Sequence, residues 1–285
     1  MLSWVDGRPA ELLSVRDRGL AYGDGLFETV AVRGGRPALL ERHLARLAEG
    51  CARLGLPYDA TVLRDELLAF SRQLGEGVAK LILTRGDGLR GYAPPQPAVA
   101  RRLLLGGARP AYPAEHAEQG VRLFPCATRL AEQPLLAGLK HLNRLEQVLA
   151  RSEWQDDEHA EGLMQDASGR VIEGVFSNLF LLKGGVLLTP DLSRCGVAGV
   201  MRAELLAQAD ALGVPCEVRD IDLAELLDPT QDIVEFAFHR RSLRIADRDA
   251  RQRRDFPDCC LIDCHDRPNV NEAAPLASRP ARFKL

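Results

Sequence analysis

Apolar and polar positions follow two different periods in the first part of this chain. Residues 26–32 (LFETVAV) and 80–84 (KLILT) are short β-rich runs that end at glycine-containing turns, which is typical of strands. Between them, residues 39–55 and 61–74 place apolar side chains at helical spacing, and Gly55 supplies a stop signal for the first. The pattern therefore predicts two amphipathic helices flanked by strands.

Short apolar runs dominate the rest of the chain. We predict strands over residues 102–105, 121–126, 161–164, 171–172, 178–182, 186–188, 215–220 and 233–238. Helices are predicted over 143–154 and 199–212, and Asp6-Gly7 indicates a hairpin turn near the N-terminus. Because strands occur in meanders rather than in alternation with helices, the fold class is α+β in two lobes, and not a doubly wound parallel sheet.

Proline residues mark the predicted boundary between the lobes. They stand at positions 94, 95, 97, 110, 113 and 125. We expect a small α/β domain over 1–107, an interdomain connection over 108–120 and a larger domain over 121–270. The pattern decays from about Asp228, and residues 271–285 are predicted to form a disordered tail.

Composition restricts the class of protein. The 285 residues are 46% hydrophobic and carry a net charge of -3, which argues against a nucleic-acid partner. The sequence offers neither a long uninterrupted apolar run nor a basic, then apolar, leader, so we expect no membrane span and no secretory signal. Seven cysteines without paired CxxC motifs favour reduced thiols in a cytoplasmic protein. A metal at Cys259, Cys260, Cys264 and His265 is disfavoured, because CCxxxCH is not a usual zinc spacing.

Lysine is rare in this chain. Of 37 basic residues only four are lysines, at positions 80, 140, 183 and 284. Arginine can replace lysine as a surface charge but not as an amine nucleophile, because guanidinium stays protonated. Lys140 follows an apolar segment and is flanked by His141 and Arg144, an environment that favours a neutral amine. Taken by itself, the local sequence favours a solvated lysine at a helix start over this catalytic role.

Three other features suggest a site for a charged cofactor. Glu173 is a carboxylate in an apolar strand pair and needs a cationic partner, which could be a protonated pyridine nitrogen or, equally, an arginine that pairs with an edge-strand glutamate. Arg46 projects from the first predicted helix and could hold a phosphate, or be an ordinary solvated arginine. The segment Gly196–Gly199 opens a helix through glycines, an arrangement that suits phosphate but is common.

Five motifs in order resemble the fold-type IV pyridoxal-phosphate (PLP) enzymes. They are RDRGLAYGDGLFET (16–29), HLARL (43–47), LKHLNRLEQV (139–148), VIEGVFSNLF (171–180) and GVAGVMR (196–202). This group contains branched-chain aminotransferases, D-amino acid aminotransferases and aminodeoxychorismate lyases. The segment KHLNRLEQV and the loop RGDGLRGY (85–92) are most similar to the lyases.

The resemblance implies a small α/β lobe and a larger lobe with a β-barrel-like core, with PLP between them, in a homodimer. Lys140 is the implied Schiff-base lysine and Glu173 the partner of the pyridine nitrogen. The remaining implied ligands of the cofactor are Arg46, Asn178, Gly199, Val200 and Met201. For the substrate, we expect contacts from Arg85, Arg90 and Asn143.

The implied reaction converts 4-amino-4-deoxychorismate into 4-aminobenzoate and pyruvate, a step toward folate, with a small-molecule substrate as the partner. An aminotransferase of the same fold and an unrelated α+β binding protein are the alternatives. The residues 225–245 depart from the family, which normally places an Asn-, Ser-, Thr- or Gly-rich turn against the phosphate there. A relative that cannot hold the cofactor is therefore a further alternative.

Overall fold

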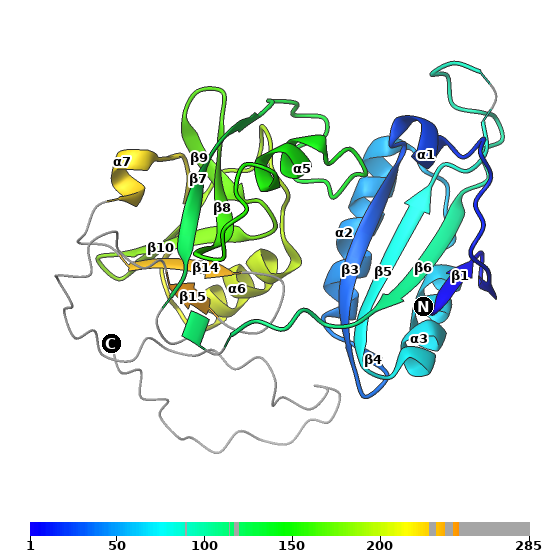
Figure 1. Ribbon diagram of the computed structural model, residues 1–285, viewed down its shortest axis with the longest axis horizontal. Helices are drawn as coiled ribbons and strands as arrows, with labels where there is room; N and C mark the ends of the chain where they lie inside the picture. The colour runs from blue at the N-terminus through cyan, green and yellow to red at the C-terminus, as the bar shows by residue number, and fades with distance from the viewer. Residues whose placement is uncertain (89, 114, 117–119, 228–231, 237–241, 245–285) are drawn as a thin grey trace.

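The chain folds into two lobes that lie side by side in the computed structural model (Figure 1). The structure describes residues 1–88, 90–113, 115–116, 120–227, 232–236 and 242–244. We call the elements β1 to β6 the first lobe and β7 to β15 the second lobe. The domain limits 1–107, 108–120 and 121–270 stay predictions. The tail 271–285 and the cysteine cluster at 259–265 lie outside the described residues.

The first lobe is an antiparallel sheet with two helices packed on it. Its strand order is β2-β1-β6-β5-β3-β4. The strands are β1 (Ser3–Val5), β2 (Arg8–Pro9), β3 (Gly25–Arg33), β4 (Arg36–Pro37), β5 (Gly77–Thr84) and β6 (Arg101–Gly107). The helices are α1 (Arg18–Tyr22), α2 (Leu40–Leu54) and α3 (Ala60–Leu74). Leu47 of α2 and Leu67 and Phe70 of α3 are buried in the core that these helices share with β3 and β5.

The second lobe contains two sheets. One has the order β12-β11-β10-β14-β15 and the other β13-β9-β8-β7. Its strands are β7 (Arg122–Leu130), β8 (His159–Asp166), β9 (Arg170–Gly174), β10 (Asn178–Lys183), β11 (Val186–Pro190), β12 (Cys216–Arg219), β13 (Ile221–Asp222), β14 (Asp232–Phe236) and β15 (Ser242–Arg244). Its helices are α5 (Leu145–Arg151), α6 (Val200–Ala211) and α7 (Leu223–Leu226). The two sheets form the curled, barrel-like core that the resemblance implies (Figure 1).

The predicted elements are confirmed with shifted limits among the described residues, and positions 237–238 of the last predicted strand lie outside them. The predicted helix 143–154 is too long, because Arg144 has a non-helical backbone (φ -117°, ψ 25°) and α5 ends at Arg151. Helix α1 was not predicted, since five residues are too few to show helical periodicity. Its start is fixed by the side chain of Asp17, which accepts from the N–H groups of Gly19 and Leu20. The short elements β4, β13, α7 and β15 also escaped prediction.

Helix α2 connects the two lobes through its arginines. Arg53 donates to the carbonyl oxygens of Pro134, Leu135 and Ala137, and Arg42 forms an ion pair with Glu204 of α6. Helix α2 therefore lies at the junction between the lobes, where it contacts residues 134–137 and helix α6. None of the helices among the described residues combines the length and apolar composition needed to cross a bilayer.

Candidate active site

Lys140 lies where a loop of the second lobe joins the sheet of the first. The carbonyl oxygen of Lys140 accepts a hydrogen bond from the N–H of Phe27 at 2.9 Å, and the N–H of Leu142 donates to the carbonyl of Gly25 at 3.0 Å. Residues 140–142 thus extend the edge of β3 over a short stretch. This backbone pairing fixes the position from which the Lys140 side chain enters the junction.

The Lys140 amine is placed in an environment that favours its neutral form. Its Nζ lies 4.5 Å from the centre of the Phe27 ring. Burial lowers the pKa of Lys140 from 10.5 to about 7, and the positive charges of Arg46 and Arg144 act in the same direction. The carboxylates of Glu28 and Glu173 oppose this shift only in part. Near neutral pH a large share of Lys140 is therefore an uncharged nucleophile.

Glu173 is the buried carboxylate of β9, with an exposed fraction of 3%. Its Oε2 accepts from the N–H of Val197 at 2.8 Å, and the Asn178 amide lies 3.5 Å from the same atom. Burial raises the pKa of Glu173 to about 7, although Val197 and the nearby Arg144 act to lower it. The buried negative charge of Glu173 has few partners, so a cationic N–H group placed against it would stabilise the ionised form.

Arg46 is held in a cluster of charged groups at the lobe junction. Its guanidinium donates to both oxygens of Glu28, at 2.8 and 2.5 Å, and to the carbonyl of Ala198 at 3.0 Å. His43 lies one turn earlier on α2, and its Nδ1 is 2.6 Å from Glu28 Oε2. Although burial raises it, the pKa of Glu28 is lowered overall by His43 and Arg46. Arg46 is thus fixed against the loop that leads into α6.

The N-terminus of α6 faces the same junction with uncapped backbone donors. Gly199 is its N-cap and has no side chain to supply a hydrogen bond. The Asn178 side chain holds the entry, since it accepts from the N–H of Gly199 at 3.0 Å and donates to the carbonyl of Val197 at 2.9 Å. The first-turn N–H groups, including those of Val200 and Met201, are therefore available to an anion.

A cavity of about 460 Å³ opens beside Lys140. It is lined by Lys140, Arg144, Gln147, Val148, Arg151, Ser152, Gln155, Val175 and Phe176. The Gln147 side chain also hydrogen-bonds Glu173, and its Oε1 is buried without a partner among the described residues. The cavity thus gives access to Lys140 and, through Gln147, to the surroundings of Glu173.

Arg85, which we predicted to bind substrate, is built into the first lobe instead. It is buried, and its guanidinium donates to Asp24 at 2.8 Å and to the carbonyls of Leu54 and Gly55 at 2.8 and 2.7 Å. These contacts close the C-terminus of α2. The Arg85 guanidinium is therefore engaged within the first lobe, and its contact with substrate stays a prediction. Sequence reasoning identified a charged residue in a glycine-rich loop but could not see its partners.

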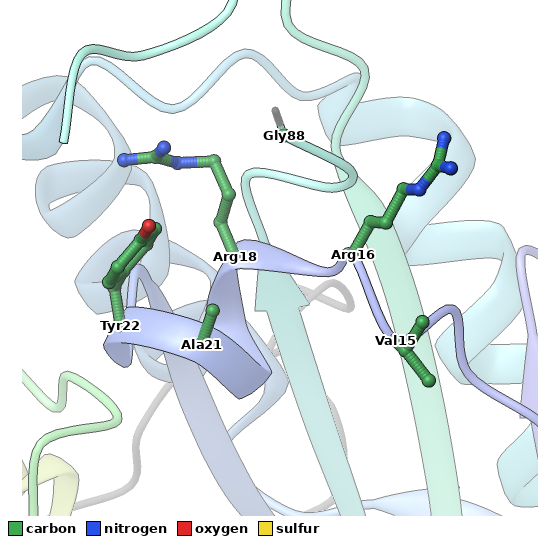
Figure 2. Close-up of a pocket in the computed structure, with 6 residues that line it drawn as sticks. All are labelled: Val15, Arg16, Arg18, Ala21, Tyr22 and Gly88. Atoms are coloured by element: carbon green, nitrogen blue, oxygen red, sulfur yellow. The ribbon is translucent and has the colours of Figure 1, made fainter. Parts of the chain in front are cut away.

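Asp24 is shared between Arg85 and a second buried arginine, Arg18. The Arg18 guanidinium donates to Asp24 at 2.8 Å and to the carbonyls of Gly91, Tyr92 and Ala93. Arg18 thereby holds one side of the glycine-rich loop next to a second depression of about 380 Å³ (Figure 2). This depression is lined by Val15, Arg16, Arg18, Ala21, Tyr22 and Gly88.

The other two predicted substrate ligands lie on exposed positions. Arg90 is exposed on the loop whose carbonyls Arg18 holds, and its role stays a prediction. Asn143 is exposed and donates to the carbonyl of Gly23 at 3.2 Å, so it connects the segment after Lys140 to the end of α1. The structure thus brings together Lys140 and the predicted cofactor ligands at the lobe junction, whereas Arg85 is directed elsewhere.

Sequence reasoning missed Glu28, His43 and Gln147. A signal for Glu28 was present, since it falls on the same face of its strand as Leu26 and Val30, both buried. A carboxylate on a buried face requires a cation, and Arg46 on the following helix was a candidate. Gln147 gave no comparable signal, because the sequence does not show which face of a short helix turns toward the cavity.

The chain belongs to the amino-transferase class IV family, whose model matches residues 25–231. Among solved structures, it is similar to 4-amino-4-deoxychorismate lyase from Pseudomonas aeruginosa, with 66% sequence identity and a TM-score of 0.83. That match covers 86% of this chain and 90% of the other. The aminodeoxychorismate lyase of Vibrio harveyi is 37% identical over 227 residues, which are 79% of this chain and 83% of the relative.

More distant structures share the fold alone. The PLP-bound form of a hypothetical aminotransferase from Mycobacterium tuberculosis has 22% identity and a TM-score of 0.74, over 86% of this chain and 90% of that one. The predicted resemblance to fold-type IV enzymes is therefore confirmed, and the alternative of an unrelated α+β binding protein is wrong.

Proposed function

We propose that this protein is a PLP-dependent 4-amino-4-deoxychorismate lyase, which forms 4-aminobenzoate and pyruvate, with Lys140 as the residue that holds the cofactor. One observation carries the proposal: an amine whose pKa is lowered to about 7 lies beside a cavity, near a buried carboxylate whose pKa is raised. The relatives from Pseudomonas aeruginosa and Vibrio harveyi support the choice of reaction.

The chemistry of the donor set fits each part of PLP. The Lys140 amine matches the aldehyde, and the buried carboxylate of Glu173 matches a protonated pyridine nitrogen. Arg46 and the uncapped N–H groups of Val200 and Met201 match the phosphate, because guanidinium forks and helix N-termini both favour anions. PLP, when bound, supplies an electron sink that stabilises negative charge at the carbon bearing the substrate amine.

Lys140 also serves as the base of the reaction. With PLP and substrate bound, the Lys140 amine would remove the ring proton from the carbon that bears the substrate amine. The enolpyruvyl C–O bond breaks as the ring becomes aromatic, and Lys140 can return the proton to the departing group. A pKa near 7 suits both directions of proton transfer at neutral pH.

The decisive experiment identifies the lysine that binds the cofactor. The purified protein is incubated with PLP, the visible spectrum is recorded, and borohydride followed by peptide mapping locates the modified lysine. We expect the adduct on Lys140, while the exposed Lys183, paired with Glu225, reports non-specific labelling. A folded protein that gives no adduct, or one on Lys183 alone, would show that it cannot hold the cofactor at this site.

Product analysis then separates the lyase from an aminotransferase. Incubation with 4-amino-4-deoxychorismate should release 4-aminobenzoate and pyruvate in equal amounts. If D-alanine or a branched-chain amino acid with 2-oxoglutarate gives glutamate faster, the protein is an aminotransferase of the same fold. We further propose that it acts in the cytoplasm and that it is a homodimer, and gel filtration with light scattering can test the second of these statements.

A further inference from the structure

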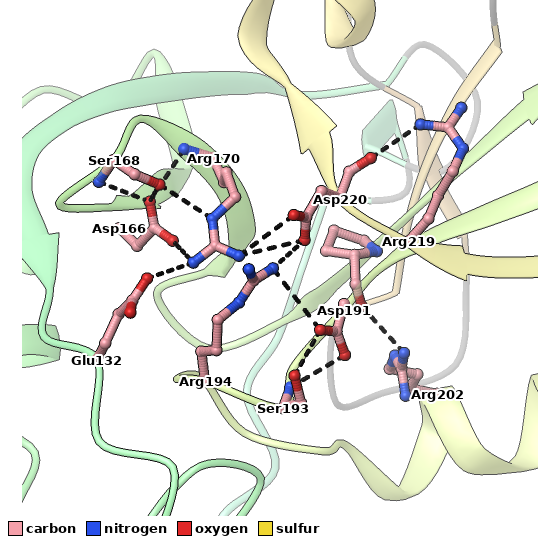
Figure 3. Close-up of polar contacts among 11 residues, drawn as sticks. Glu132, Asp166, Ser168, Arg170, Asp191, Ser193, Arg194, Arg202, Arg219 and Asp220 are labelled. Carbon is pink, nitrogen blue, oxygen red and sulfur yellow. Dashed lines mark hydrogen bonds and ion pairs between the residues drawn. The ribbon is translucent and has the colours of Figure 1, made fainter.

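A network of charged side chains lies in the second lobe, and none of its members lines the cavity beside Lys140 (Figure 3). Its centre is Arg170, the first residue of β9, three positions before Glu173. The Arg170 side chain is 14% exposed and forms ion pairs with Asp166, Glu132 and Asp220. Its Nε also donates to Ser168 at 3.0 Å. One guanidinium thus joins several segments of the second lobe.

Through Glu132, the network reaches the segment that leads to Lys140. Arg170 Nη2 donates to Glu132 Oε1 at 2.5 Å. The next residue, Gln133, donates its backbone N–H to the carbonyl of Arg194 at 2.8 Å. Glu132 and Gln133 are therefore held at one end of the short segment 132–139, which ends directly before Lys140.

Through Asp220, the network reaches the loop that leads into α6. Asp220 accepts from Arg170 Nη1 at 3.2 and 3.3 Å and also pairs with Arg194 (Figure 3). Arg194 directly precedes the segment 195–199, in which the Val197 N–H donates to Glu173 and Gly199 is the N-cap residue of α6. This segment is therefore linked, through Arg194 and Asp220, to the same guanidinium as the segment before Lys140.

The two segments also pair with each other. The N–H of Gly138 donates to the carbonyl of Gly196 at 2.9 Å, and the N–H of Ala198 donates to the carbonyl of Gly138 at 3.0 Å. A displacement of either segment would therefore move Lys140 relative to Val197. Charge-assisted contacts at their distal ends restrict such a displacement, because the arginine fork fixes direction as well as distance.

We propose that Arg170 is a positioning residue that sets the relative placement of Lys140, Glu173 and the N-terminus of α6. The inference rests on the proposed function, because those three groups are assigned to PLP there. Arg170 acts through Glu132, Asp220 and its own strand, and not by contact with cofactor or substrate.

The test compares Arg170→Met, Arg170→Lys and Asp220→Asn with the control Arg102→Met. Arg102 is a fair control, since it makes a bidentate ion pair with Glu66 at 2.9 Å in the first lobe. PLP affinity, thermal midpoint and the pH midpoint of Lys140 modification in the PLP-free protein are measured for each. The last readout does not require cofactor binding.

We expect Arg170→Met to weaken PLP binding by roughly 10- to 100-fold. This is the range observed when a residue that orients a metal ligand by a hydrogen bond is replaced. The pH midpoint of Lys140 should rise, because a displaced amine is less buried. Arg170→Lys should recover part of both effects, Asp220→Asn should show them more weakly, and Arg102→Met should lower only the thermal midpoint.

The outcomes separate this inference from the proposed function. If wild-type protein binds PLP but the Arg170 and Asp220 variants differ from it only in thermal midpoint, Arg170 is structural and the inference is wrong. If wild-type protein binds no PLP, the proposed function fails, and the pH midpoint of Lys140 still decides whether Arg170 positions that amine. If Arg170→Met does not fold, Asp220→Asn provides the same test. The Asp220 side chain is half-exposed, so its replacement should not prevent folding.

Discussion

Modification of the PLP-free protein across a range of pH should show Lys140 losing its proton near neutrality. Burial, together with the charges of Arg46 and Arg144, lowers the pKa of Lys140 from 10.5 to about 7. At pH 8 an amine with the lower value is ~90% neutral, whereas one with the ordinary value is ~0.3% neutral. The structure thus predicts a difference of roughly 300-fold in the reactive fraction at that pH.

Reductive methylation with limiting formaldehyde, followed by peptide mass spectrometry, measures this fraction residue by residue. The initial rate at Lys140 is fitted against pH, and the rate at the exposed Lys183 monitors the quality of the reagent. Below pH 7, the rate at Lys140 should fall about tenfold per pH unit as the amine becomes protonated. The rate of PLP capture should show the same acidic decline.

Two substitutions should move the midpoint in opposite directions. Arg46→Gln removes a positive charge that lowers the pKa of Lys140, so the midpoint should move to higher pH. Glu28→Gln removes a negative charge that raises this pKa, so the midpoint should move to lower pH. A wild-type midpoint above about pH 9, or shifts of the opposite sign, would refute the electrostatic account of Lys140.

Three further substitutions test other parts of the structure. Glu173→Gln should retain PLP capture but lower lyase turnover by roughly 10²- to 10³-fold, because a neutral amide cannot hold a pyridinium charge; unchanged turnover would contradict this role. Gly199→Ala would place a methyl group 2.0 Å from Asn178 Oδ1, and it should weaken PLP binding and cost about 1–3 kcal/mol in denaturant unfolding. Gly107→Ala is the control, since no atom lies within 4 Å of the added carbon. Phe70→Ala, at a fully buried position, should cost about 3–5 kcal/mol, and a loss below 1 kcal/mol would argue against the core of the first lobe.

The extent to which the fold could be predicted follows from the length of each pattern. Helices α2 and α3 each span 15 residues, which allows four turns of apolar spacing and a glycine after the last turn. Helix α1 has five residues and its buried side chain is the charged Arg18, so no apolar period exists to be detected. Its existence depends on Asp17 and on the distant carbonyls that Arg18 binds, which are tertiary information.

The candidate site was predictable where a residue type is chemically irreplaceable. Lys140, the proposed Schiff-base lysine, and the buried acid Glu173 each belong to a motif, and both lie at the lobe junction. Arg85 shows the limit of this reasoning, because a charged residue in a glycine-rich loop can be a substrate ligand or a structural arginine, and the sequence does not distinguish the two. Its actual partners, Asp24 and the end of α2, are set by folding, which brings together residues 30 or more positions apart.

The scarcity of lysine acquires a structural meaning in this fold. Arg18 and Arg53 each donate to three backbone carbonyls, and Arg85 donates to two and to a carboxylate. Such contacts need several donors in a fixed plane, which a guanidinium provides and a compact ammonium does not. These arginines hold loops and helix ends in place, a task that requires a permanent charge. In the proposed function Lys140 has the opposite requirement, because there its amine must lose its charge near neutral pH, and lysine is the basic side chain that can do so when it is buried.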